Sequence, residues 1–202
     1  MARKSTTAME KTKQCLLENG LFLLQKRGYN ATGIQEIATL SNIPKGSFYN
    51  YFPSKEAFGV AVIHYYAKIT TNLWRELLAT PVNVDNPCET LSSSFLAITQ
   101  KYYCTEIKKG CLLGTLSAEL SEASEECRTA LKEAIEQFKI ILIDCLNTAQ
   151  QKNKIRRDIP AENLADLIWD CWQGSMLNMR VKKSIVPVQQ NLNIIFKYLL
   201  CP

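Results

Sequence analysis

The sequence predicts an all-α protein with an N-terminal helix-turn-helix domain at residues 1–53 and a larger helical domain at residues 54–202. Apolar residues recur at three- and four-residue spacing along most of the chain, which is typical of amphipathic helices, and no stretch shows the period-two alternation of a strand. Positive charge is concentrated at one end: residues 1–60 hold eight Lys and Arg against four Glu, a net charge of +4 out of +5. This asymmetry indicates a nucleic-acid-facing module joined to a near-neutral body.

Three short helices are expected in the first domain. The first ends at residues 26–28, Lys-Arg-Gly, where cations lie in the last turn and the glycine can adopt a left-handed conformation. Residues 32–35 fit a capping box in which Thr32 caps a second helix of about two turns. Pro44 suits the first turn of a third helix, which we expect to run to about Phe52. The short connection between the second and third helices is that of a helix-turn-helix.

The third helix is predicted to have an apolar back and a small, cationic front. Phe48, Tyr51 and Phe52 share one face and are expected to pack as core, although a plain three-helix bundle would need the same rings. A recognition helix enters the major groove by its N-terminal end, and a glycine there lets the backbone approach a phosphate. The groups available for DNA contact are Lys45, Gly46, Ser47, Tyr49 and Asn50.

The rest of the chain is predicted to be helical as well. Ser54 should cap a long fourth helix, and a loop with two prolines follows residue 80. Further helices are expected at about residues 91–102, 111–120, 124–152, 160–180 and 187–200.

The eight cysteines and one histidine predict neither a metal nor another cofactor. No two cysteines stand in C-x-x-C spacing and His64 has no Cys/His cluster beside it, so we expect mostly reduced thiols that pack as small apolar groups. No run reaches the roughly 18 apolar residues of a membrane span, and the N-terminus lacks the apolar centre of a signal peptide. We therefore expect a cytoplasmic protein with no membrane partner.

Residues 28–58, GYNATGIQEIATLSNIPKGSFYNYFPSKEAF, resemble the DNA-binding signature of the tetracycline-repressor family of bacterial regulators. The resemblance implies a homodimer that binds a palindromic double-stranded DNA operator and releases it when an effector binds the C-terminal helical domain. It also implies DNA contacts at Thr32, Lys45, Gly46, Ser47, Tyr49, Asn50 and Lys55.

Two segments of the body, residues 108–131 and 173–184, are similar to the subgroup that includes the acrylate- and N-ethylmaleimide-responsive repressors. In the latter, the cysteine of a G-C-L motif senses electrophiles and oxidants, and it matches Cys111. Family members often carry lysine where this chain has Arg180. Arginine stays protonated, which disfavours a covalent switch between lysine and cysteine.

Two kinds of effector site are open. Cys111 follows Lys108 and Lys109 near a helix start, and both features stabilise a thiolate; the alternative is an inert core cysteine beside Leu112 and Leu116. A noncovalent effector would instead use large, amphipathic side chains, for which ordinary core packing is the alternative. These are Trp74, Phe95, Tyr102, Tyr103, Trp169, Trp172 and Met176.

Two apolar stripes are predicted to form an isologous four-helix dimer interface, unless they face only their own domain. One stripe is Leu131, Ile135, Phe138 and Leu142, and the other is Leu164, Ile168 and Cys171.

The function expected from all of these features is an effector-responsive transcriptional repressor, not an enzyme. The alternatives are a thiol-dependent enzyme that uses Cys111 on electrophiles, which would lack a nearby base, and a DNA-binding protein without an effector.

Overall fold

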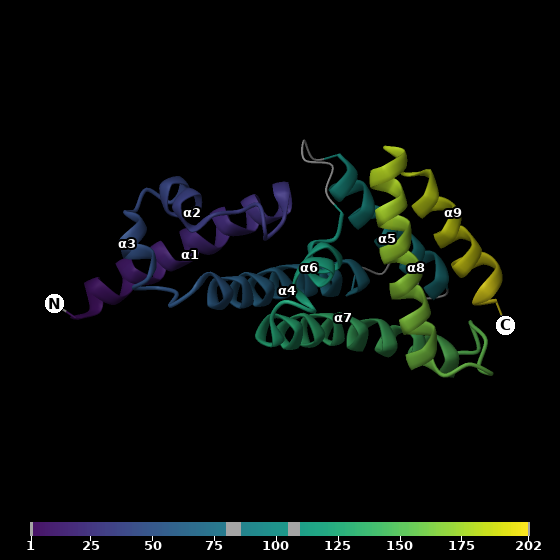
Figure 1. Ribbon diagram of the computed structural model, residues 1–202. Coiled ribbons are helices and arrows are strands. Elements are labelled where there is room, and N and C mark those ends of the chain that lie inside the picture. The colour runs from purple at the N-terminus through teal and green to yellow at the C-terminus, as the bar shows by residue number, and fades with distance from the viewer. Residues whose placement is uncertain (1, 80–85, 105–109, 202) are drawn as a thin grey trace. The chain divides into compact units, whose positions relative to one another are not determined.

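The computed structural model describes residues 2–79, 86–104 and 110–201, with side chains from residue 7 onward except at Ala79 (Figure 1). Within those ranges all regular structure is helical, as the sequence predicts. The helices are α1 (Ala2–Arg27), α2 (Ile34–Leu40), α3 (Lys45–Phe48), α4 (Lys55–Ala79), α5 (Pro87–Tyr103), α6 (Leu112–Leu120), α7 (Glu125–Gln151), α8 (Ala161–Lys182), α9 (Val186–Ile194) and a π-helical turn η1 (Ile195–Leu199).

The chain forms two compact units. The first unit comprises residues 1–68 and 112–134, so α6 and the start of α7 belong with the N-terminal helices. The second unit comprises residues 69–111 and 135–202. The boundaries between the units fall inside α4, directly before α6 and inside α7.

The first unit is built around an aromatic cluster that joins α3 to α4. The ring of Phe58 packs 5.4 Å from that of Phe48 and 5.0 Å from that of Phe52, centroid to centroid, and all three rings are at most 3% exposed. Gly20 of α1 allows this packing, because a Cβ atom there would lie 2.1 Å from Cζ of Phe58. Edge-to-face contacts of this kind favour one fixed arrangement of the helices.

Several predicted helix ends are confirmed. Gly28 follows α1 with φ of +82°, and its N–H donates to the Leu24 carbonyl at 2.9 Å. The Ser54 hydroxyl accepts a hydrogen bond from the N–H of Ala57 at 2.9 Å and so caps α4. Ser124 caps α7 in the same way.

Two local predictions are wrong. The capping box does not form, because Gly33 is the N-cap of α2 and the hydroxyl of Thr32 donates instead to the Gly28 carbonyl at 2.7 Å. The third helix ends at Phe48, not at about Phe52. From Tyr49 the chain continues in turns, in which the N–H groups of residues 49–51 bond to the carbonyl three residues earlier and that of Phe52 bonds to the Phe48 carbonyl.

The second unit packs around a larger set of rings. Trp74 of α4 lies 4.6 Å from Phe95 of α5 and 4.9 Å from Phe138 of α7, and Trp172 of α8 contacts both Trp74 and Phe95. The indole N–H of Trp172 donates to the hydroxyl of Thr99 at 3.0 Å, so this buried polar group is satisfied. Helix α5 also packs against α9 and η1, and α8 packs against α9.

The predicted dimer stripes are wrong in their main members. Five of their residues are at most 5% exposed within the single chain, so they face their own units and leave no surface for a partner: Leu131, Phe138, Leu142, Leu164 and Ile168.

Among the described helices, none combines the length and apolar character that crossing a membrane requires.

Candidate nucleic-acid interface and effector site

The N-terminal end of α3 presents a small, charged and polar surface to solvent. Lys45, Gly46 and Asn50 are exposed, and Tyr49 is 49% exposed. A Cβ on Gly46 would have no atom within 4 Å beyond its chain neighbours and the backbone of its own helix. Phe48 is fully buried and Phe52 is 3% exposed, as predicted for core rings, whereas Tyr51 is only half-buried.

The turn before α3 is held by residues that sequence reasoning missed. Asn42 adopts a left-handed conformation with φ of 54°, which asparagine tolerates better than most residues. The N–H of Ile43 then bonds to the Ala38 carbonyl at 3.0 Å. From α1, the Asn19 amide donates to the hydroxyl of Ser41 at 3.0 Å. The asparagine in the polar break was the available signal for this turn, whereas nothing local marks Asn19.

Two predicted DNA contacts have side chains that are engaged inside the unit. Thr32 is 1% exposed, with its hydroxyl bonded to a carbonyl. The amine of Lys55 donates to the Tyr29 carbonyl at 2.8 Å and lies 4.3 Å from the centre of the Tyr29 ring. Burial lowers the pKa of Lys55, while the charge of Glu119 opposes that shift. These two side chains therefore order the surface around α3 and do not extend from it.

Helix α6 is tied to the loop between α1 and α2. The carboxylate of Glu119 accepts from the N–H of Asn30 at 2.8 Å, and a Cβ on Gly28 would lie 2.2 Å from the same carboxylate. Ser124, before α7, donates to the carboxylate of Glu56 at the start of α4. Burial first, and then nearby negative charge, raises the pKa of Tyr29 to about 12. Sequence reasoning missed Glu119, because its partner lies 89 residues away.

Cys111 lies directly before the first residue of α6 and is 6% exposed. The stem of Arg180 passes close by, since a Cβ on Gly110 would lie 3.2 Å from its Cδ. The structure thus brings Arg180 next to the residue that precedes Cys111. The predicted Lys108 and Lys109 lie outside the described residues.

The predicted pocket aromatics are brought together, but as packed core. Trp74, Phe95, Trp172 and Met176 are at most 3% exposed. Tyr103 is half-buried, and its hydroxyl donates to the Lys183 carbonyl at 2.9 Å. Tyr102 is half-buried in the same turn of α5.

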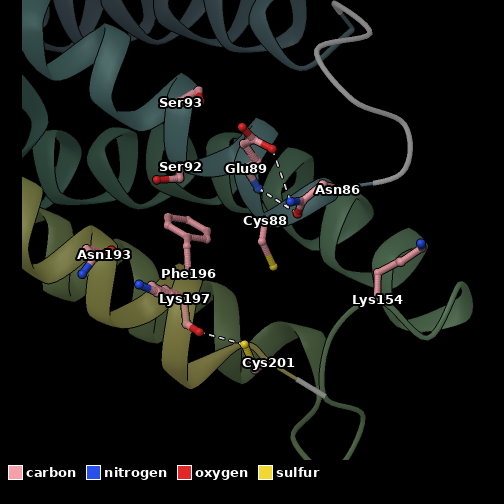
Figure 2. A pocket seen from close by; sticks show the side chains of 10 residues that line it. All are labelled: Asn86, Cys88, Glu89, Ser92, Ser93, Lys154, Asn193, Phe196, Lys197 and Cys201. Atoms are coloured by element: carbon pink, nitrogen blue, oxygen red, sulfur yellow. Dashed lines mark hydrogen bonds between the residues drawn. The ribbon is translucent and has the colours of Figure 1, made fainter.

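A cavity of about 380 Å³ lies elsewhere in the second unit, between the start of α5 and the end of the chain (Figure 2). None of the predicted effector residues lines it. Its lining residues include Asn86, Cys88, Glu89, Lys154, Phe196, Lys197 and Cys201.

Comparison with known proteins agrees with this architecture. Residues 16–62 match the family described as bacterial regulatory proteins, tetR family, and residues 89–195 match the tetracyclin repressor-like C-terminal domain. The chain is 35% identical over 189 residues to the HTH-type transcriptional repressor DhaR of Mycobacterium sp. (strain GP1), covering 93% of this chain and 92% of that protein.

The repressor NemR of Escherichia coli (strain K12) is 28% identical over 90% of each chain. The crystal structure of its reduced form superposes with a TM-score of 0.84 at 26% identity, covering 95% of this chain and 97% of NemR. Both relatives are described as HTH-type transcriptional repressors. The chain therefore belongs to the TetR family of helix-turn-helix transcriptional regulators.

Proposed function

We propose that the chain is a dimeric repressor in which residues 1–53 bind operator DNA in the cytoplasm and residues 54–202 receive an effector. The observation that carries this proposal is the exposed front of α3, open at Gly46 and backed by the buried Phe48. In the proposal Lys45, Gly46, Ser47, Tyr49 and Asn50 contact DNA directly. Thr32 and Lys55 contribute through the backbone that their side chains hold in place.

DNA binding is tested on the DNA upstream of the gene, by fluorescence anisotropy at several salt concentrations. Lys45→Ala removes one cationic contact, so the slope of log K against log salt should fall by about one. Lys152→Ala, at an exposed lysine beyond the end of α7, is the matched control and should leave the slope unchanged. Equal slopes for parent and Lys45→Ala would remove this residue from the interface.

The dimer surface is proposed on the outer faces of α7 and α8. Ile140, Leu177 and Val181 are 56%, 57% and 81% exposed, which is unusual for apolar residues on long helices. Leu167, Gly174 and Val181 follow one another at seven-residue spacing, so they share one face of α8. Leu167 is 40% exposed, and a Cβ on Gly174 would meet nothing within 4 Å. A small residue within such a stripe lets a second helix approach closely, as an isologous interface requires.

Charge on this face should break the dimer. Val181→Glu is expected to convert the protein to monomers in sedimentation velocity, because the carboxylate would be buried without a partner. Ile194→Glu, at a similarly exposed apolar residue on α9, is the control and should stay dimeric. A dimeric Val181→Glu protein would place the interface elsewhere.

Release of DNA is proposed to follow either modification of Cys111 or noncovalent effector binding. Addition of the Cys111 sulfur to a maleimide forms one C–S bond, opens the C=C π bond and delivers the thiol proton to the neighbouring carbon. The adduct adds bulk to a side chain that is only 6% exposed, and its buried surroundings cannot accept that bulk without rearranging. Moving a two-state equilibrium from mostly competent to mostly incompetent needs about 5.5 kcal/mol, which covalent chemistry can supply.

The maleimide assay separates Cys111 from the other thiols. N-ethylmaleimide should release the parent protein from DNA but not the Cys111→Ser variant, whereas Cys104→Ser, at an exposed cysteine, should respond as the parent does. Release of Cys111→Ser at the parental dose would end the proposed role of this cysteine.

A noncovalent effector has a candidate anchor in Gln173. Within the part of the chain that the structure describes, its side-chain amide nitrogen is buried and has no hydrogen-bond partner. A buried donor without a partner costs about 1–3 kcal/mol, and an anionic ligand would relieve that cost. Gln173→Met should be more stable than the parent, because it removes the unpaired donor. Acrylate, used as the anionic probe, should raise the melting temperature of the parent but not that of Gln173→Met. Equal responses of the two proteins to acrylate would contradict this role.

A further inference from the structure

Two cysteines from distant parts of the sequence line the cavity in the second unit. Cys88 lies in the first turn of α5, and Cys201 follows the π-helical turn at the end of the chain. Figure 2 shows the sulfur of Cys88 pointing toward the end of the chain that carries Cys201, with the ring of Phe196 beside them. The thiol of Cys201 donates to the carbonyl of Lys197 one turn earlier, which holds it at the cavity.

The surroundings of Cys88 favour a protonated thiol in the free protein. Burial raises the pKa of Cys88, and negative charge on Cys201, which lines the same cavity, raises it further. The charged groups that line the cavity are Lys154, Lys197 and Glu89, and Glu89 also accepts from the side-chain amide of Asn86 at 3.3 Å. Because two thiolates would repel each other here, a ligand that forms a neutral complex with both sulfurs suits the site best.

We propose that Cys88 and Cys201 form a dithiol site for trivalent arsenic compounds that carry one organic substituent. With phenylarsine oxide as the probe, two As–S bonds form and both thiol protons leave with the arsenic-bound oxygen as one water molecule. No atom changes oxidation state, and the product carries no charge. A cavity of about 380 Å³ falls within the size range of small-ligand sites, so it can hold the phenyl group beside Phe196.

The number of donors distinguishes this ligand from a metal ion. In the described residues no group of three or more His, Cys, Asp and Glu side chains is placed to hold a metal. Monosubstituted arsenic needs only two sulfurs, because carbon occupies its third valence. Once one sulfur is bound, the second acts at an effective concentration of about millimolar or higher, so the chelate should resist a competing monothiol that strips single-sulfur adducts.

The test uses the reduced full-length protein without DNA, so its outcome is independent of the proposed repressor function. The protein is treated with phenylarsine oxide, challenged with excess glutathione, and its intact mass and peptide map are recorded. The parent should keep one phenylarsenic group that joins the peptides containing Cys88 and Cys201. Cys88→Ser and Cys201→Ser should each lose it to glutathione, and Cys104→Ser, an exposed cysteine at the end of α5, should keep it.

Serine is close to isosteric with cysteine, and the Cys201 side chain is exposed, so the Cys201→Ser variant should fold as the parent does. A parent that loses the arsenical to glutathione would overturn the proposal. Retention by both single variants would also overturn it, because the chelate would then involve other cysteines.

Discussion

Replacing Gly20 by alanine should destabilise the first unit, although glycine-to-alanine changes inside helices usually stabilise. The new Cβ would lie 2.1 Å from Cζ and 2.8 Å from Cε1 of Phe58, whereas carbon atoms pack at about 3.5–4.0 Å. The ring must therefore move by about 1.5 Å. It is fully buried against Phe48 and Phe52, so it has no free space to enter.

The two opposing effects can be compared in size. Alanine gains about 0.5–1 kcal/mol from the lower entropy of the unfolded chain, while overpacking a core costs about 1–3 kcal/mol and occasionally more. The short contact places Gly20→Ala at the upper end of that range, so we expect a net loss of about 2 kcal/mol. For a chain of this length the melting temperature should fall by about 4–8 °C. Because the displaced ring supports Phe48, operator affinity should fall as well.

Thermal unfolding followed by circular dichroism measures this effect, and two variants test its cause. Gly46→Ala, where a Cβ meets nothing within 4 Å, should melt at or above the parental temperature. Phe58→Leu removes the atoms that collide, so combined with Gly20→Ala it should cost clearly less than the sum of the single changes, by about 1 kcal/mol or more. A Gly20→Ala protein as stable as the parent, or an additive double variant, would refute the packing argument.

Three further changes probe other parts of the structure. Gly28→Ala places a side chain on a left-handed backbone, which costs about 1–2 kcal/mol, and its Cβ displaces the Glu119 carboxylate. It should therefore lower the melting temperature more than Gly33→Ala, where a Cβ meets nothing within 4 Å. Ser54→Ala removes the cap of α4 and should cost about 1 kcal/mol in urea unfolding, and Ser54→Thr should recover most of it. Trp172→Phe loses the hydrogen bond from the indole N–H and leaves a small cavity, so it should cost about 1–2 kcal/mol and change the near-ultraviolet circular dichroism of the second unit.

Local signals in the sequence located most helix ends, because caps and breakers act within a few residues. Gly28, Ser54 and Ser124 all have the roles that their neighbours indicate. Thr32 misled because a threonine hydroxyl can bond backward to a carbonyl as readily as forward to an N–H, and the chain takes the backward bond. The third helix was predicted, but its end was placed four residues too late, since its extent depends on how Phe48 and Phe52 pack against Phe58 of α4 and not on helix propensity.

The periodicity of the sequence identified an apolar stripe on α7, but it did not show whether the chain's own core or a partner subunit buries that stripe. Phe138 is 5% exposed and Ile140, two residues later, is 56% exposed, so the same helix has both a core face and an open apolar face. The longer stripe, which includes Phe138, is buried within the chain itself, because folding buries the widest apolar face of the helix in the core. The proposed dimer surface therefore consists of apolar residues that stay exposed after folding, and periodicity alone does not separate them from core residues.

Among the three glycines Gly20, Gly28 and Gly46, the fold requires the first two but not the third. Gly20 needs to be glycine because of Phe58, and Gly28 because of its positive φ. Gly46 has neither constraint, yet it occupies a helix, where glycine costs about 0.5–1 kcal/mol relative to alanine. In the proposed DNA complex, a phosphate that approaches the bare backbone at the N-terminal end of α3 would offset this cost. Gly46→Ala should therefore be at least as stable as the parent and bind operator more weakly, and a variant that keeps full affinity would show that no partner approaches this backbone.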